Sequence, residues 1–281
     1  EVIVESQALP DLPAATDVVF PALHGEFGED GGMQSLLDDI GMPYVGSSAD
    51  ASALIMDKVR SKDRLVAANL PTPAYCRIAD TAAPFPVDFQ RPVVVKPVSQ
   101  GSTVGLTCLR EPGDAAWAQA VQAAFAAGGT AMVEQYIEGT EITVGVLDGE
   151  PLPVLEIIPP DGRLFDYDAK YEHKLGKTQY LAPPKHVSAA TQAYAQKLAA
   201  HTYRLLDARD MLRVDYIVDS AGRPWILEAN SIPGFTASSL LPKAARAAGV
   251  SFVELCARLT YHAFRDRLRR CVNAVGDRVP H

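Results

Sequence analysis

The sequence predicts a mixed α/β protein with more than one domain. Three observations predict it: a strand, glycine-rich loop and helix near the start, alternating strands and helices in the middle, and a pair of adjacent strands near residue 220. Elements in this order build sheets that are covered by helices. A chain of 281 residues is long enough for two domains or three small subdomains.

The first predicted unit combines a strand, a loop and a helix. Residues 17–23 are predicted to form a short buried strand, and the loop at 24–32 contains four glycines. Apolar residues at helical spacing then continue to Ile40, and Gly41 ends the helix. His24 directly follows the strand, where α/β proteins form ligand sites, although a lone histidine is more often structural.

The central region alternates between helices and strands. A helix at 49–70 is predicted to end at Pro71 and Pro73, because proline cannot continue a helix. The other predicted elements here are strands at 92–96 and 104–109, a helix at 114–127, and strands at 131–136 and 141–147.

The C-terminal region is predicted to contain two helices and one pair of strands. The helices span 188–206 and 240–264, with a break near 249–251 in the second. The basic stretch at 265–281 is expected to be a solvated tail. The strands are 213–219 and the segment that starts at Ile226, and the turn at 219–224 joins them.

This predicted hairpin carries four polar side chains that could share one face. Side chains alternate along a strand, so Arg213 and Asp215 lie on one face, as do Glu228 and Asn230. If Asp215 lies opposite Glu228 in an antiparallel pair, Arg213 lies opposite Asn230. Two carboxylates and an amide oxygen are ligands that suit Mg²⁺. The same residues would also suit the solvated face of an ordinary hairpin.

A loop at 96–105 has the composition of a phosphate-binding loop. Its backbone N–H groups and the hydroxyls of Ser102 and Thr103 could close over phosphates, and Lys96 adds a charge at the end of an apolar strand. The sequence contains neither the Walker A spacing nor a G-x-G-x-x-G dinucleotide motif. A simple hairpin turn explains the loop equally well.

Further candidates lie outside these two segments. Lys58 is a second possible phosphate contact. Glu134 and Glu141 flank a turn between strands and could bind adenine and ribose, although exposed glutamates at strand ends are the commoner case. The aromatic and charged stretch at 166–171 has no strand or helix period, which indicates a functional lid.

Composition excludes several classes of protein. The net charge of −8 argues against a general nucleic-acid binder, because phosphate binding needs a basic surface. No apolar run reaches the roughly 18 residues of a membrane span. The four cysteines are far apart and form no C-x-x-C pair, so a cytoplasmic location is expected. The chain opens on Glu1 instead of methionine, and we expect it to be incomplete at its front.

Taken together, these motifs resemble the ATP-grasp enzymes and, more narrowly, the D-alanine–D-alanine ligases. The resemblance runs from about residue 17 to 260 in a single order. The matching strings are Leu23-His24-Gly25, Gly28-Glu29-Asp30-Gly31, Pro43-Tyr44-Val45-Gly46-Ser47, Met56-Asp57-Lys58, Lys96-Pro97, Gly101-Ser102-Thr103-Val104-Gly105, Glu134, Gly139, Glu141, Asp166-Tyr167-Asp168-Ala169-Lys170-Tyr171, Arg213-Val214-Asp215, Leu227-Glu228-Ala229-Asn230-Ser231-Ile232-Pro233-Gly234 and Ser238-Ser239-Leu240.

The resemblance implies an α+β ATP-grasp fold with a partial N-terminal α/β domain and two ATP-grasp subdomains. The implied boundaries are 1–47 for the rest of the N-terminal substrate domain, 48–137 for the central ATP-binding domain and 138–281 for the C-terminal catalytic domain. Roughly 50 residues, the length of a βαβ unit and more, are expected to precede the segment. They would hold the glutamate that positions the first substrate's ammonium group in this family.

The resemblance also implies how ATP and metal ions are bound. Lys58, Lys96 and Lys170 would contact the nucleotide as cations. Adenine would be bound by Glu134 together with the neighbouring backbone at Gln135 and Ile137, and ribose by Glu141. Two Mg²⁺ ions, or Mn²⁺ in their place, would be held by Asp215, Glu228 and Asn230.

The implied reaction joins two D-alanine molecules through an acyl phosphate, in the synthesis of peptidoglycan precursors, and the implied assembly is a homodimer. Arg213 and the Gly234 N–H would stabilise the oxyanion of the tetrahedral intermediate. Ser239 and the Leu240 N–H would anchor the carboxylate of the second D-alanine. His24 would contact substrate. Ser102 and Tyr171 would couple the two loops when these are closed.

Two alternatives stay open at this stage. One is a ligase that takes D-lactate or D-serine as its second substrate; Lys170 and Tyr171 favour D-alanine. The other is a binding module of the same fold that has lost turnover. The presence of Arg213, Asp215 and Glu228 argues against it, because a decayed site would lose its metal ligands early. Phe235 and Ser231 are mild departures from the family pattern, and Leu164 stands where the family often has an aromatic residue near adenine.

Overall fold

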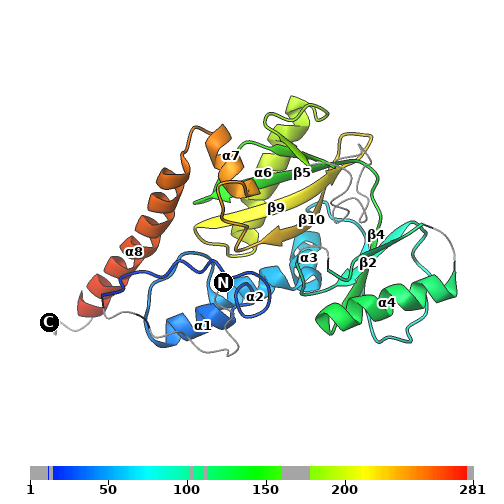
Figure 1. The fold of residues 1–281 in the computed structure, drawn as a ribbon, viewed down its shortest axis with the longest axis horizontal. Coiled ribbons are helices and arrows are strands. Elements are labelled where there is room, and N and C mark those ends of the chain that lie inside the picture. The colour runs from blue at the N-terminus through cyan, green and yellow to red at the C-terminus, as the bar shows by residue number, and fades with distance from the viewer. Residues whose placement is uncertain (1–11, 13–14, 102–103, 111–112, 160–177, 277–281) are drawn as a thin grey trace.

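Two antiparallel sheets lie side by side and are covered by helices (Figure 1). The computed structural model describes residues 12, 15–101, 104–110, 113–159 and 178–276. Within this part, a four-stranded sheet and a six-stranded sheet form separate cores. Among the helices described, none combines the length and the apolar character that a membrane crossing requires.

The four-stranded sheet has the order β1-β4-β2-β3. Its strands are β1 (Tyr75–Ile78), β2 (Val93–Pro97), β3 (Thr107–Leu109) and β4 (Ala131–Gln135). Helix α4 (Asp114–Gly128) covers one face, because Trp117 and Val121 pack on the buried valines of the sheet. The strand predicted at 104–109 is shorter in the structure, where β3 begins only at Thr107. Strand β1 was not predicted from the sequence.

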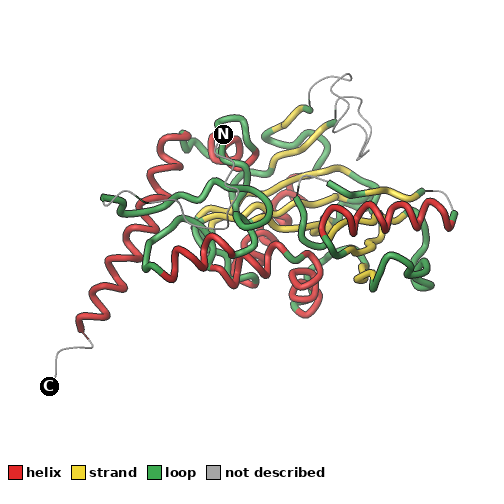
Figure 2. Tube along the Cα trace, turned by 60° about the horizontal axis from the view of Figure 1, so that its bottom comes forward, coloured by secondary structure: helices red, strands yellow, loops and turns green. Residues whose placement is uncertain are grey.

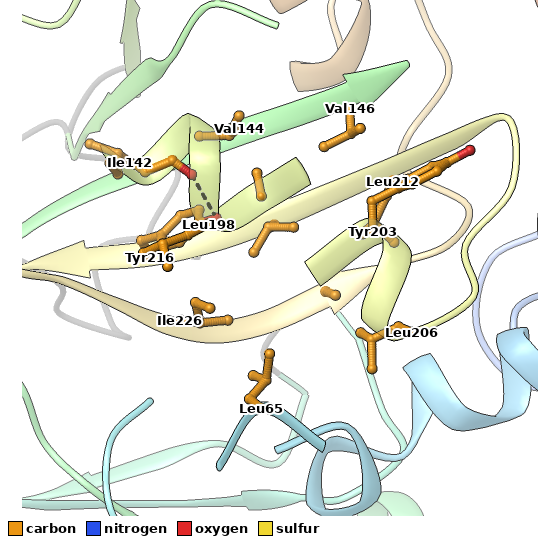
Figure 3. Close-up of a cluster of buried hydrophobic side chains, with 14 of the residues drawn as sticks. Leu65, Ile142, Val144, Val146, Leu198, Tyr203, Leu206, Leu212, Tyr216 and Ile226 are labelled. Carbon is orange, nitrogen blue, oxygen red and sulfur yellow. Dashed lines mark hydrogen bonds between the residues drawn. The ribbon is translucent and has the colours of Figure 1, made fainter. Parts of the chain in front are cut away.

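The six-stranded sheet has the order β10-β9-β5-β7-β8, and β6 pairs with β5. Its strands are β5 (Thr140–Leu147), β6 (Glu150–Pro151), β7 (Leu155–Ile158), β8 (Gln179–Leu181), β9 (Met211–Val218) and β10 (Pro224–Asn230). Helix α6 (Ala189–Leu205) covers one face with Leu198 and Tyr203, against Val144 and Tyr216 of the sheet (Figure 3).

Two short helices replace the single helix predicted at 49–70. Helix α2 (Ala49–Met56) and helix α3 (Lys58–Ala67) are separated by Asp57, which has an extended backbone. The Asp57 carboxylate accepts a 2.9 Å hydrogen bond from the Arg60 N–H and so caps α3. Leu65 of α3 belongs to the core of the six-stranded sheet (Figure 3). The cap therefore makes Lys58 the first residue of a helix that packs on this sheet.

The N-terminal part differs from its prediction in one element. Helix α1 (Gly32–Asp39) is confirmed, but the strand predicted at 17–23 is wrong. In its place the described residues hold an isolated parallel bridge between Val19 and Tyr44. Val19 uses its own N–H and C=O in that bridge, whereas Pro21 has no N–H with which to extend it.

The C-terminal part ends in a long helix that extends away from the rest of the molecule (Figures 1 and 2). The predicted break is confirmed, since α7 (Leu240–Ala247) and α8 (Phe252–Gly276) are separate helices. The tail predicted from residue 265 is wrong, because α8 continues to Gly276. Residues 265–276 contain no proline and are rich in arginine and other helix-forming residues, so nothing in this stretch stops the helix.

Candidate active site

A cleft of about 690 Å³ is lined by residues of both sheets, α3 and the N-terminal part. The predicted site residues that line it are His24, Lys58, Lys96, Glu141, Arg213, Asp215, Glu228, Asn230, Gly234 and Leu240. Residues from both ends of the chain thus meet at one place.

The hairpin of β9 and β10 forms the floor of this cleft. Its register confirms the predicted pairing: Glu228 lies opposite Asp215, and Asn230 lies opposite Arg213. The register shifts between Ile226 and Glu228, so Leu227 is an extra residue in the strand. This β-bulge was not predicted, because simple alternation puts residues 226 and 228 on the same face.

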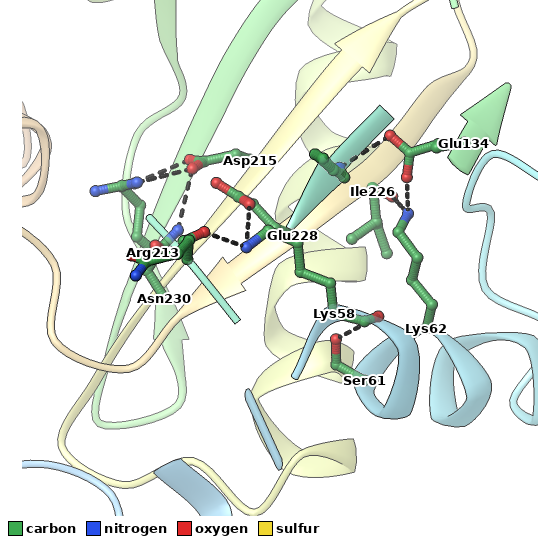
Figure 4. A network of polar contacts seen from close by, with 11 residues as sticks. Lys58, Ser61, Lys62, Glu134, Arg213, Asp215, Ile226, Glu228 and Asn230 are labelled. Carbon is green, nitrogen blue, oxygen red and sulfur yellow. Dashed lines mark hydrogen bonds and ion pairs between the residues drawn. The ribbon is translucent and has the colours of Figure 1, made fainter. Parts of the chain in front are cut away.

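Asp215 is held by three neighbours at the centre of the floor. Arg213 donates two hydrogen bonds to its two carboxylate oxygens, from Nε at 2.9 Å and from Nη2 at 2.8 Å (Figure 4). The Thr143 hydroxyl donates at 2.6 Å and the Asn230 amide at 3.1 Å. Burial alone would lower the pKa of Arg213, but the charge of Asp215 outweighs burial and raises it.

Glu228 lies beside the cations of the cleft. Its carboxylate is 3.4 Å from the Lys58 ammonium, which also donates a 2.6 Å hydrogen bond to the carbonyl of Gln100. Burial opposes ionisation of Glu228, but the charges of Lys58, Lys96 and Arg213 prevail and lower its pKa to about 2. Glu228 is therefore an anion at any physiological pH.

Glu134 lies behind the cleft wall and is almost fully buried. One carboxylate oxygen is 3.0 Å from the Lys96 ammonium and the other is 2.5 Å from the Lys62 ammonium. Burial opposes ionisation of Glu134, but the two lysines outweigh it and lower its pKa. In this structure the Glu134 side chain binds lysines, and its contact with adenine remains a prediction.

The other residues predicted for adenine and ribose lie nearby. Glu141 is buried and lines the cleft. The Gln135 side chain donates hydrogen bonds to the carbonyls of Gln90 and Pro92, both at 2.9 Å, and its backbone N–H donates to the Ala74 carbonyl at 2.8 Å. Ile137 lies in that connection, between β4 and β5.

Of the predicted substrate residues, His24 and Leu240 line the cleft, and Ser239 lies next to Leu240. His24 is 3.4 Å from Glu29, and this hydrogen bond raises the pKa of the imidazole. Leu240 begins α7, where the first backbone N–H groups have no partner in the helix. Ser239 precedes it, and a Cβ added to Gly234 would lie 3.1 Å from its hydroxyl oxygen. The Gly234 loop therefore packs directly on the start of α7.

Three predicted site residues are Ser102, Lys170 and Tyr171. They lie outside the described residues. Their roles remain predictions.

The donor set of the floor fits magnesium. Within the part of the chain that is described, no three histidine, cysteine, aspartate or glutamate side chains cluster as a metal site would require. The fit therefore depends on Asp215, Glu228 and Asn230, which offer two carboxylates and one amide oxygen from paired positions. Oxygen donors of this number suit Mg²⁺, which completes its shell with water and phosphate oxygens.

Two family models match this chain. A family model described as "D-ala D-ala ligase C-terminus" matches residues 79–261, and one described as "D-ala D-ala ligase N-terminus" matches residues 3–47. The chain belongs to the D-alanine–D-alanine ligase family.

Relatives within the D-alanine–D-alanine ligases are similar over most of their length. The D-alanine–D-alanine ligase of Gloeobacter violaceus is 44% identical, over 89% of this chain and 84% of its own. That of Magnetococcus marinus is 40% identical, over 86% of this chain and 79% of its own.

Solved structures of D-alanine–D-alanine ligases have the same fold. The Bacillus anthracis enzyme complexed with ATP gives a TM-score of 0.76 at 29% identity, over 90% of this chain and 81% of its own. The Coxiella burnetii enzyme gives a TM-score of 0.76 at 28% identity, over 93% of this chain and 73% of its own. The predicted ATP-grasp fold is thereby confirmed.

Sequence reasoning missed three side chains that shape this site, namely Glu29, Lys62 and Thr143. Glu29 lies within a motif that carried the family resemblance, and it lines the cleft. Lys62 follows Lys58 by one helical turn, which is the signal that could have revealed it. Thr143 lies opposite Asp215 in the pairing of β5 with β9, and only the sheet order shows this.

Proposed function

We propose that the protein joins two D-alanine molecules to D-alanyl-D-alanine with ATP, through an acyl phosphate, for the synthesis of peptidoglycan precursors. The observation that carries the proposal is the hairpin register, which sets Asp215, Glu228, Arg213 and Asn230 on one floor beside Lys58 and Lys96. Family membership supports the choice of reaction.

ATP would bind along the cleft between the two sheets. Lys58 and Lys96 would contact its phosphates as point charges, and Glu141 would accept hydrogen bonds from ribose. Adenine would be bound by Glu134 and by the neighbouring backbone at Gln135, the last residue of β4, and at Ile137. One solved relative, the Bacillus anthracis enzyme, is complexed with ATP, which supports this choice of nucleotide.

Asp215, Glu228 and Asn230 would hold two Mg²⁺ ions. When bound, the ions neutralise phosphate charge during phosphoryl transfer. Because Arg213 occupies both carboxylate oxygens of Asp215, it would have to share this carboxylate with a metal.

The first step is phosphoryl transfer to the carboxylate of the first D-alanine, which yields ADP and an acyl phosphate. The amine of the second D-alanine then attacks the carbonyl carbon and forms a tetrahedral oxyanion. Arg213 and the Gly234 N–H would stabilise that charge. The C–O bond to phosphate breaks, inorganic phosphate leaves, and the amine loses its proton.

The two substrates would lie at the end of the cleft that His24 and α7 form. His24 would contact the first D-alanine. The Ser239 hydroxyl and the Leu240 N–H would bind the carboxylate of the second, since a helix N-terminus favours an anion. Ser102 and Tyr171 would couple two loops in the closed site. Lys170 would contact the nucleotide.

The partners that we propose are small molecules and a second copy of the chain. A homodimer agrees with the family. A cytoplasmic location agrees with the four cysteines, which are scattered along the sequence as expected in a reducing compartment. The net charge of −8 argues against nucleic acid as a partner.

Phosphate release from ATP and Mg²⁺ tests the function, with D-alanine, D-lactate or D-serine offered as the second substrate. We expect release with D-alanine alone, and D-alanyl-D-alanine as the product by mass spectrometry. Preference for D-lactate or D-serine would instead assign a ligase with another second substrate. If nucleotide binds but no substrate supports release, the protein is a binding module and the proposal fails.

A further inference from the structure

Lys62 is the most deeply buried cation among the described residues, and the proposed reaction gives it no task. Its ammonium contacts three acceptors: the Glu134 carboxylate at 2.5 Å, the Thr72 hydroxyl at 2.6 Å and the Ile226 carbonyl at 3.3 Å. The Lys62 side chain is only 1% exposed, so its ammonium is enclosed by protein groups. Lys62 therefore acts on its protein neighbours, and it does not line the cleft.

The contact with Glu134 reaches the wall of the four-stranded sheet. Glu134 lies on β4, and its other oxygen is 3.0 Å from the Lys96 ammonium on β2. The two lysines thus share one buried carboxylate, which fixes the position of both. Loss of Lys62 would let Glu134 rotate, and the Lys96 ammonium would lose its fixed partner.

The contact with Ile226 reaches the floor of the six-stranded sheet. Ile226 lies opposite Tyr216, and both point into the core. The β-bulge at Leu227 then brings Glu228 opposite Asp215, on the cleft face. In a regular pairing Glu228 would lie opposite Val214 and point into the core instead. The bulge is therefore what exposes Glu228 to the cleft.

Lys62 and Thr72 hold the backbone at the start of this bulge. The Ile226 carbonyl accepts from the Lys62 ammonium and, at 2.8 Å, from the Thr72 hydroxyl. The Ile226 N–H donates to the Pro71 carbonyl at 2.8 Å. Both backbone groups of Ile226 are thus fixed from outside the hairpin.

We propose that Lys62 is a positioning residue for the ligation reaction, which sets Lys96 through Glu134 and sets Glu228 through the bulge at Ile226. One lysine of α3 thereby aligns the phosphate-binding wall with the metal-binding floor (Figure 4). This role rests on the proposed function, because it gives Lys96 and Glu228 their tasks toward a nucleotide and a metal.

The test compares Lys62→Met, Thr72→Val and the control Lys197→Met, an exposed lysine on α6. The main readout is the affinity for ADP with Mg²⁺ by calorimetry, and melting temperatures show which variants are folded. We expect Lys62→Met to weaken binding about 10- to 100-fold, as loss of an outer-sphere partner does. Thr72→Val should weaken it about three- to tenfold, and Lys197→Met should bind as the wild type does.

Kinetics separate positioning from a purely structural role. Positioning predicts a raised KM for ATP in Lys62→Met, with the KM for D-alanine changed far less. A structural role predicts a lower active fraction, with kcat reduced and both KM values unchanged. Normal affinity for ADP and Mg²⁺ in folded Lys62→Met would overturn the proposal.

Two complications have defined outcomes. If Lys62→Met does not fold, Thr72→Val decides, and wild-type binding in that variant overturns the proposal. If the wild type shows no D-alanine-dependent phosphate release, the proposed function fails. The calorimetric comparison still reports on Lys62 in that case, because it needs no second substrate.

Discussion

At the scale of single residues, the cleft shows how neighbours decide what a carboxylate does. Glu134 and Glu228 are both surrounded by lysines, yet Glu134 lies behind the wall and Glu228 faces the cleft. In this structure Glu134 contacts protein and its adenine contact stays a prediction, whereas Glu228 faces the cleft and can act on a ligand. The family resemblance implied ligand contacts for both, and residue type alone does not reveal which side of a strand faces the cleft.

Glu228→Gln should reduce turnover by at least about 100-fold, because it removes a charge from the proposed metal site. The low pKa of Glu228 means that its anion stabilises the fold above the ordinary pKa near 4.5, and that this contribution is lost as the pH falls toward 2. Kinetics measure the first effect. Urea unfolding from pH 7 to pH 2 measures the second, as a difference from the wild type that shrinks on acidification.

Glu254→Gln is the matched control, since Glu254 is exposed on α8 and pairs with Arg258 one turn away. It should leave turnover unchanged, as surface pairs of this kind contribute little. Wild-type turnover in Glu228→Gln would remove Glu228 from the metal site.

At the scale of elements, the capped start of α3 places two lysines at once. Lys58 and Lys62 are one turn apart, so both project toward the cleft side of the helix (Figure 4). Periodicity predicted one helix across this region, and it missed the break because the spacing of apolar residues carries no sign of the cap at Asp57. The bulge at Leu227 was missed for a related reason: the alternation pattern contains no sign of an inserted residue.

Asp57→Ala should cost about 1 kcal/mol of unfolding free energy, since it removes the cap of α3, and it should raise the KM for ATP. Ser188→Ala removes the equivalent cap of α6, far from the cleft, and should cost a similar amount with no change in KM. Urea unfolding and ATP titrations of both variants check this. Equal KM values in the two variants would show that the α3 cap does not position Lys58.

At the scale of the whole molecule, the N-terminal part is attached to the six-stranded sheet through Asp210. The buried carboxylate of Asp210 accepts a 2.8 Å hydrogen bond from the Gly46 N–H, and Arg209 donates to the Gly46 carbonyl at 2.7 Å. The sequence predicted the order of helices and strands and the motifs of the cleft. It could not predict these contacts, because they join positions more than 160 residues apart.

Asp210→Ala should destabilise the protein by about 1–3 kcal/mol, because it leaves the buried Gly46 N–H unpaired. It should also raise the KM for D-alanine more than the KM for ATP, since His24 belongs to the attached part. Thermal unfolding and substrate titrations measure both effects. Asp39→Ala, an exposed change at the end of α1, serves as the control. A larger effect on ATP than on D-alanine would contradict this division of the cleft.

The lining of the cleft has a consequence for the order in which its ligands arrive. Three permanent cations line it, Lys58, Lys96 and Arg213, against the four carboxylates Glu29, Glu141, Asp215 and Glu228. The described lining is thus slightly negative, and by itself it does not balance the four charges of free ATP. Under the proposed function, divalent ions would supply the missing positive charge when the nucleotide enters. Under that function we therefore expect nucleotide affinity to depend on metal, before any bond is made or broken.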